Sequence, residues 1–172
     1  MLFKSYTIFI LLLVFVTNAA CAGNKYNTKQ KINIEITSHL GDKQSFFKDD
    51  VIKFLINLDV DAYITVVYQT AEGQLIQLLP NQKEKTTLYK AGLFISVPSD
   101  NVPYQFTIQA PYGNEKVWVF ASDKPVKQLA GKILQNGLTV VSVTIPNIKN
   151  QIQASSIKHF GQSSFALKTE NK

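Results

Sequence analysis

The chain has 172 residues, 45% of them hydrophobic, which is enough apolar material for one well-packed core, so we expect a single domain. Its 18 basic residues are all lysines and outnumber the 12 acidic residues, which gives a formal net charge of +6. Because the lysines are spread along the chain and no arginine can grip a phosphate or a base edge with two hydrogen bonds, the composition argues against a nucleic-acid partner.

The amino-terminal residues have the layout of a secretory signal peptide. Lys4 precedes an apolar run over residues 6–16, and small residues follow at 19–22. The run is well short of the ~20 residues that a helix needs to cross a bilayer, which favours cleavage over a retained anchor. We therefore predict that residues 1–22 are a signal peptide and that the protein is exported, to the periplasm or outer membrane of a bacterium or into the medium.

Two kinds of cleavage are compatible with the end of this segment. Cys21 follows Ala19 and Ala20, as the lipidated cysteine of a bacterial lipoprotein would, although Asn18 stands where an aliphatic residue is usual. The same stretch satisfies the small-x-small rule of ordinary signal peptidase. Membrane attachment through a lipid on Cys21 and release without a lipid therefore both stay open. With one cysteine in the sequence, no internal disulfide is expected.

The rest of the chain predicts a short polar tether at residues 23–30 and one β-sandwich domain at residues 31–172. Its central feature is the stretch 58–80, where two apolar, β-branched segments flank a reversal at residues 70–73, as in a buried hairpin. Alternation and short apolar runs predict further strands at residues 32–37, 52–58, 93–97, 104–109, 117–121, 138–145 and 163–168, with 104–109 and 117–121 forming a second hairpin. This pattern indicates an all-β, antiparallel sandwich.

One short helix is expected within this β fold. Ser122 or Asp123 can cap it, Pro125 falls in its first turn, and apolar residues recur on one side until Asn136-Gly137 ends it. We expect this helix to pack over an open end or edge of the sandwich. Residues 146–161 show no clear pattern, and the sequence does not decide whether the stretch 149–172 is ordered.

Short motifs follow one another in order along the middle of the chain. They are Ala62-Tyr63, Glu72-Gly73, Leu78-Leu79-Pro80-Asn81, Lys90-Ala91-Gly92, Val97-Pro98, Pro111-Tyr112-Gly113-Asn114-Glu115 and Ala121-Ser122-Asp123-Lys124-Pro125. From about Lys48 to Pro125 the sequence thereby resembles the bacterial family catalogued as domain of unknown function 4384. The resemblance implies an immunoglobulin-like β-sandwich, found in exported bacterial proteins and as an accessory domain beside enzymatic or repeat modules. It brings no catalytic residues.

Physical chemistry assigns scaffold roles to these positions. Glycines are expected where the chain reverses, prolines where strands end or a helix begins, and aromatic residues between the sheets. The predicted structural motif is Ala62, Tyr63, Gly73, Pro80, Asn81, Gly92, Pro98, Gly113 and Pro125, with Tyr63, Tyr104, Phe106 and Trp118 as the aromatic filling. The alternative is a stacking platform for sugars, formed by Tyr63, Tyr89, Tyr112 and Trp118.

The sequence offers no convincing catalytic or metal-binding constellation. His39 and His159 have no acid or nucleophile at a recognisable spacing. Glu72 and Glu115 are both expected in hairpin turns, without an apolar run to raise the pKa of either. The acids at positions 49, 50, 59 and 61 suit turns better than a calcium loop. We predict no catalytic, cofactor or metal residues, and a protein that is not an enzyme.

Three functions remain as hypotheses. The first is a noncatalytic envelope protein that binds or assembles with a protein partner in the cell envelope, through its sheet edges and the loops at residues 81–90 and 99–103. The second is a carbohydrate or cell-wall binding module that uses the aromatic platform. The third is an outer-membrane lipoprotein of a secretion machine, attached through Cys21.

Overall fold

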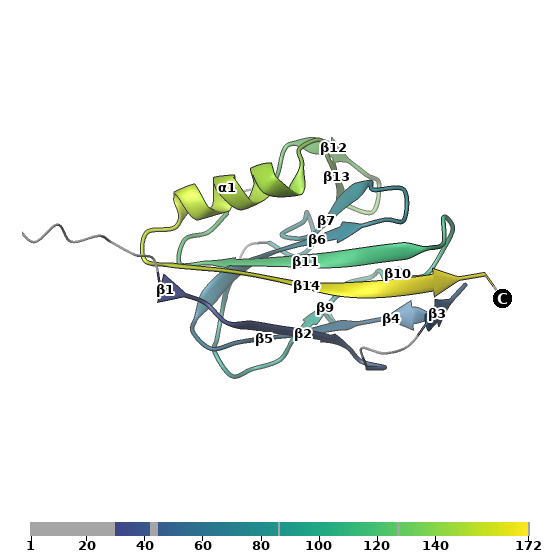
Figure 1. Cartoon of the computed structure of the whole chain (residues 1–172), viewed down its shortest axis with the longest axis horizontal. Helices are drawn as coiled ribbons and strands as arrows, with labels where there is room; N and C mark the ends of the chain where they lie inside the picture. Colours follow the sequence, from purple (N-terminus) through teal and green to yellow (C-terminus); the bar gives the residue numbers. More distant parts are fainter. Residues whose placement is uncertain (1–29, 42–44, 86, 127, 172) are drawn as a thin grey trace, which may run out of the picture.

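The computed structural model describes residues 30–41, 45–85, 87–126 and 128–171, and it is a β-sandwich with one helix (Figure 1). Sheet A contains, in hydrogen-bonded order, β1 (Gln30–Lys31), β14 (His159–Glu170), β11 (Asn114–Ser122), β6 (Ala62–Gln69), β7 (Leu75–Leu79), β13 (Thr139–Val141) and β12 (Gly131–Ile133). In addition, β3 (Ser45–Phe47) pairs with β14, and β8 (Leu88–Tyr89) pairs with β6. Sheet B contains β2 (Ile34–Ser38), β5 (Phe54–Leu58) and β9 (Ile95–Val97), and sheet C pairs β4 (Val51–Ile52) with β10 (Phe106–Thr107).

The predicted fold class, an all-β and mainly antiparallel sandwich with one short helix, is confirmed. Parallel pairing occurs where the short strands β1 and β3 run beside the long strand β14. The predicted signal peptide, Cys21 and all but the last residue of the predicted tether lie outside the described residues.

The centre of sheet A is formed by β6, β11 and β14. The register pairs Val66 with Val119 and continues along β14 as far as Lys168, which lies opposite Asn114. The predicted central hairpin is confirmed, because β6 pairs with β7 across a turn that Gly73 closes by donating its N–H to the carbonyl oxygen of Thr70. Gly73 has φ of +83°, in the left-handed region that a residue with a Cβ rarely adopts.

The main core lies between one face of sheet A and sheets B and C. Phe54 on β5 is fully buried, and its ring meets Phe106 and Phe165 edge-on with centroids 5.2 and 6.2 Å apart. Phe106 in turn contacts Tyr68 of sheet A at 4.8 Å. The alternation predicted for residues 52–58 is realised here, since Ile52, Phe54, Ile56 and Leu58 are all buried completely.

The opposite face of sheet A is covered by α1 (Ile145–Ser155), as Figure 1 shows. Pro146 stands in the first turn, where a missing N–H costs nothing, and Ile148 and Ile152 share one face of the helix because they are four residues apart. Both are fully buried, and they form a second cluster with Val67, Leu75, Phe120, Val126, Leu129 and Val141. We call this set the helix cluster.

The location predicted for the helix was wrong. Residues 122–136 contain β12 instead, which pairs with β13 across a turn at Asn136-Gly137, where Gly137 has φ of +87°. Pro125 therefore begins no helix, and Asp123 accepts hydrogen bonds from the N–H groups of Ile157 and Lys158, beyond the end of α1. The helix forms within residues 145–155, most of which showed no clear pattern in the sequence.

The predicted second hairpin was also wrong. The short strand β10 pairs with β4, whereas β11 lies in the other sheet between β6 and β14. The predicted aromatic filling divides in the same way. Phe106 and Tyr104 pack against the main core, whereas Trp118 packs against the helix cluster, and Tyr63 points to that same face because it follows the fully buried Ala62 on a strand.

Candidate binding surface

Two connections lie together along one side of the sandwich. Residues 80–87 link β7 to β8 in sheet A, and residues 98–105 link β9 in sheet B to β10 in sheet C. They contain most of the two loops that the sequence predicted as a contact surface. We call them the loop pair, and within the described residues they are joined by a polar network that connects one sheet to the other.

Asn81 organises the first loop from within. Its side chain is 5% exposed, and its Oδ1 accepts hydrogen bonds from the N–H groups of Lys83 and Glu84 at 2.7 and 2.8 Å. Its Nδ2 donates to the carbonyl oxygen of Leu78 at 2.6 Å and to the hydroxyl of Tyr104 at 2.9 Å. An asparagine that satisfies nearby backbone groups in this way fixes a turn, and here the last bond also reaches the second loop.

Tyr104 and Glu84 complete the connection between the loops. The Tyr104 hydroxyl donates to Glu84 Oε2 at 2.8 Å, and Glu84 Oε1 accepts the N–H of Ser99 at 3.3 Å. Burial raises the pKa of the Tyr104 phenol, and the hydrogen bond and negative charge of Glu84 raise it further. The phenol therefore remains protonated and donating at neutral pH, so the network braces the two loops.

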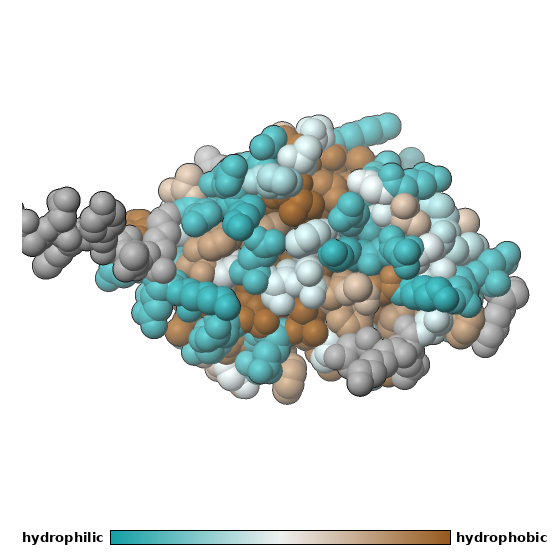
Figure 2. All heavy atoms as spheres, viewed as in Figure 1, coloured by the Kyte–Doolittle hydropathy of each residue, from teal (hydrophilic) through white to brown (hydrophobic). Residues whose placement is uncertain are grey.

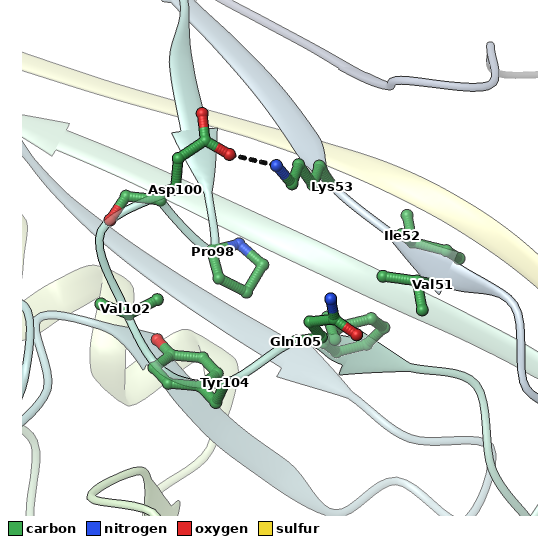
Figure 3. Close-up of a pocket in the computed structure, with 10 residues that line it drawn as sticks. Val51, Ile52, Lys53, Pro98, Asp100, Val102, Tyr104 and Gln105 are labelled. Atoms are coloured by element: carbon green, nitrogen blue, oxygen red, sulfur yellow. Dashed lines mark hydrogen bonds and ion pairs between the residues drawn. The ribbon is translucent and has the colours of Figure 1, made fainter.

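A small cavity opens beside the second loop (Figure 3). Its volume is about 240 Å³, and its lining includes Pro98, Tyr104 and Val51. Figure 3 shows Lys53 and Asp100 facing each other across its upper rim, where they form an ion pair. Sites for drug-sized ligands have volumes of roughly 300–1,000 Å³, so this cavity suits a side chain of a partner better than a cofactor.

A wider hollow flanks the first loop. It has a volume of about 670 Å³, and it is lined by Pro80, Asn81, Gln82, Lys83, Lys85 and Gln128. Lys83 and Lys85 are both exposed, whereas the Asn81 side chain beneath them is buried. The loop pair thus presents basic side chains on a backbone that internal hydrogen bonds hold in place.

The predicted motif residues occupy the following positions. Ala62 is fully buried at the start of β6, and half-buried Tyr63 pairs with Leu88 and Ser122. Pro80 directly follows β7 and Pro98 directly follows β9, and both are buried, as expected for residues that end strands. Gly92 donates its N–H to the carbonyl oxygen of Leu58. Pro80, Asn81 and Pro98 belong to the loop pair, whereas Gly113 lies against Ala71 beside the turn of Gly73.

The two histidines lie apart from the loop pair. His39 Nδ1 accepts the N–H of Lys53 at 3.1 Å, and His39 itself is exposed. His159 begins β14, and its Nδ1 is buried without a hydrogen-bond partner. Neither histidine lines the cavity beside Pro98 or the hollow beside Asn81.

Glu115 departs from what the sequence predicted. It lies in β11 rather than in a turn and is only 4% exposed, whereas Glu72 is exposed in the turn after β6. Burial raises the pKa of Glu115, opposed by hydrogen bonds from the side chains of Tyr68 and Thr169 and from the N–H of Ala71. The expectation that neither carboxylate is perturbed was therefore wrong. The signal was available in the alternation of residues 115, 117, 119 and 121, which places Glu115 on the core face.

Comparison with protein families gives a match to the middle of the chain. Residues 45–125 match the family model described as domain of unknown function (DUF4384). Residues 45–125 are thus similar to DUF4384, and we call them the DUF4384 segment. This agrees with the resemblance noted for residues 48–125, and because the function of DUF4384 is unknown, the match assigns no catalytic activity.

The DUF4384 segment does not form a complete sandwich by itself. It runs from β3 to just beyond β11, and it includes the loop pair. However, β11 also pairs over its whole length with β14, which lies after the segment, and β5 pairs with β2, which lies before it. Phe165 and Leu167 of β14 belong to the main core. The DUF4384 segment therefore folds here together with flanking strands.

Three other findings bear on function. No curated protein and no solved structure matches the chain. Among the described residues, no helix is both long and apolar enough to span a bilayer. Within the same residues, no group of three or more histidine, cysteine, aspartate or glutamate side chains is arranged to hold a metal ion.

Proposed function

We propose that this protein is a noncatalytic binding or assembly module of the bacterial cell envelope, which contacts a protein partner through the loop pair. The observation that carries the proposal is the Asn81–Tyr104–Glu84 network, because it holds two loops from different sheets in one arrangement before any partner is bound. A preformed surface loses little conformational freedom on binding, which favours affinity.

The chemistry of the surface also favours a protein partner. Exposed Lys83 and Lys85 lie beside a hollow, and the small cavity at Pro98 can accept one side chain. We expect the partner to supply acidic groups opposite the lysines and an apolar or aromatic side chain for the cavity. The sheet edge at β9 lies next to the second loop and can extend the contact through its free backbone groups.

Site-specific photo-crosslinking tests this proposal in cells that produce the protein. A photoreactive residue at Lys83 is expected to give one predominant adduct with an exported protein, identified by mass spectrometry. The matched control is the same residue at Lys149, which is exposed on α1 at the other face of sheet A. Equal adduct patterns from both positions, or none from Lys83, would overturn the assignment of the loop pair.

Export and attachment form a separate part of the proposal. The sequence of residues 1–22 supports export to the periplasm or outer membrane, with Cys21 as the residue that a lipoprotein of a secretion machine would carry in lipidated form. The mass of the mature amino terminus distinguishes a lipidated Cys21 from a chain that begins after the signal peptide. An intact residue 1 in the cellular protein would contradict cleavage of a signal peptide.

Carbohydrate binding has less support. The platform would need Tyr63, Tyr89, Tyr112 and Trp118 on one surface. Tyr89 and Tyr112 pack against the main core, whereas Trp118 packs against the helix cluster on the other face of sheet A and lies under Lys116 Nζ, 4.9 Å from the ring centroid. Binding of peptidoglycan fragments that Trp118→Ala abolishes would restore this alternative.

A further inference from the structure

One end of the molecule gathers several loops around the point where the described chain begins. Gln30 at the start of β1 donates its N–H to the carbonyl oxygen of Lys158, just before β14, at 2.7 Å. In Figure 1 this end lies on the left, and the carboxyl terminus lies at the opposite end. The loops that meet here are residues 31–33, 59–61, 90–94, 123–126 and 156–158, and we call them the β1 end.

Hydrogen bonds tie these loops to one another. Asp123 accepts the N–H groups of Ile157 and Lys158, at 2.9 and 2.8 Å. On the other side of the same end, Asp61 accepts the N–H of Ala91 at 2.9 Å and forms an ion pair with Lys90 at 2.7 Å. The carboxylate of Asp59 accepts hydrogen bonds from the backbone N–H and the side-chain amide of Asn33. The end is thus a braced surface.

Exposed apolar side chains concentrate on this surface. Among the described residues, the two most exposed large apolar side chains are Phe94 at 69% and Leu93 at 62%, and both lie in the loop that follows Gly92. Ile157, at 52%, and Leu88, at 44%, belong to the neighbouring strand ends. Leu93 and Phe94 follow Gly92, whose N–H donates to the carbonyl oxygen of Leu58 at the end of β5, whereas Leu88 pairs with Tyr63 near the start of β6 and Ile157 precedes β14. All four side chains therefore belong to strand ends or loops at the β1 end.

Lysines surround the apolar side chains. Lys31, Lys124 and Lys158 are exposed at this end, and Lys90, also exposed, is paired with Asp61. The three carboxylates of these loops, Asp59, Asp61 and Asp123, are already engaged by groups within the protein. Figure 2 shows hydrophobic and hydrophilic residues intermixed over the visible face of the molecule.

The position of the amino-terminal segment indicates what covers this surface, namely a membrane. Cys21 precedes Gln30 by nine residues, which span at most about 30 Å when fully extended. Any attachment at residues 1–21 therefore keeps the β1 end close to the membrane, whereas the opposite end can lie farther away. Two further lysines, at positions 25 and 29, occur in the connecting sequence and would add to the attraction for anionic headgroups.

We propose that the β1 end rests on an anionic phospholipid surface, with Leu93 and Phe94 inserted among the acyl chains and the lysines on the headgroups. This inference rests on the proposed attachment to the envelope and adds an orientation to it. The loop pair then lies along the side of the molecule, where a protein partner can reach it while the β1 end is covered by lipid.

Fluorescence of the full chain in vesicles of phosphatidylethanolamine and phosphatidylglycerol tests the orientation. Trp118, the one tryptophan of the sequence, is first replaced by phenylalanine, and Phe94→Trp is then compared with Leu40→Trp. Leu40 is the matched control, because it is 41% exposed and lies two residues after Ser38, which ends β2 at the opposite end from Asn33. Circular dichroism checks that both variants keep the wild-type fold.

Brominated phospholipids are expected to reduce the emission of the Phe94→Trp variant about twofold and to leave that of the Leu40→Trp variant unchanged. Vesicles that bind the chain without quenching Phe94→Trp would overturn the inference, since the amino-terminal segment alone would then hold the protein. Equal quenching of both variants would overturn it too. The crosslink at Lys83 reports on the protein partner independently, so either proposal can fail while the other stands.

Discussion

The two faces of sheet A are built from different parts of the chain. The main core takes Phe54, Ile56 and Val97 from strands within the DUF4384 segment, and β14 closes it. The helix cluster takes Val67, Leu75 and Phe120 from the same segment, but its cover comes from residues 126–152. The domain match therefore accounts for most of the main core, whereas the residues that cover the other face of sheet A lie outside it. We expect truncations in the main core to lower the free energy of unfolding more than truncations in the helix cluster.

The largest effect is expected from Phe54→Ala. The ring is completely buried and contacts two other aromatic rings, so its loss removes edge-on contacts and leaves a cavity between the sheets. Truncation of a buried phenylalanine costs about 3–5 kcal/mol, which is a large part of the stability of a small domain. Urea denaturation measures the loss, with Phe94→Ala, at 69% exposure, as a control expected to change the free energy of unfolding by less than about 0.5 kcal/mol.

A smaller and more local effect is expected from Ile152→Ala. The side chain is fully buried on α1, and truncation costs about 2–4 kcal/mol. Because α1 only covers one face, hydrogen exchange should show faster exchange for the amides of α1 while β6 and β11 keep their protection. If β6 and β11 lose as much protection as α1, the two faces of sheet A unfold as one cooperative unit and do not differ in this respect.

The same contrast explains which elements could be predicted from the sequence. The hairpin of β6 and β7 was predictable because two apolar segments flank a turn with Gly73. The helix was misplaced because the apolar spacing of residues 126–134 fits a helix, whereas Asn136-Gly137 is equally a hairpin signal, and the pairing of β12 with β13 decided between them. Ile145, Ile148 and Ile152 of α1 have helical spacing, but Ile145 was assigned to the β-branched stretch 138–145, and the two isoleucines that remained did not stand out.

The candidate site was predictable only in part. The loops at residues 81–90 and 99–103 could be identified as polar connections, but their contact depends on bonds between Asn81, Glu84 and Tyr104 over 20 or more positions of sequence. No local pattern encodes such a pairing. The carboxylate of Glu115 was missed for a related reason, because the strand that buries it against Tyr68 was expected to begin only at residue 117.

A moderate effect is expected from Tyr104→Phe. The substitution keeps the ring but removes the hydroxyl that donates to Glu84 and accepts from Asn81. Loss of such a bond to a charged group costs about 1–3 kcal/mol, and here partial exposure of Glu84 should keep the cost near the lower limit. Limited proteolysis should show faster cleavage within residues 81–87 and unchanged α1. Cleavage that accelerates equally in both would show that the network braces the whole fold rather than the loop pair.

The smallest effect, and one of opposite sign, is expected from Glu115→Gln. Burial raises the pKa of Glu115 in the folded protein above its value in the unfolded chain. The protonated form is therefore favoured by folding, so the contribution of this group to stability is fully present below the unfolded pKa and is lost as the pH rises through the folded pKa.

Glutamine stays neutral and can still accept the hydrogen bonds from Tyr68 and Thr169. Denaturation at several pH values should show the variant slightly more stable than wild type at pH 8, with the difference changing sign or vanishing near pH 4. Parallel pH profiles for the two proteins would mean that Glu115 titrates alike in the folded and unfolded chains, and that its burial in the main core has no electrostatic cost.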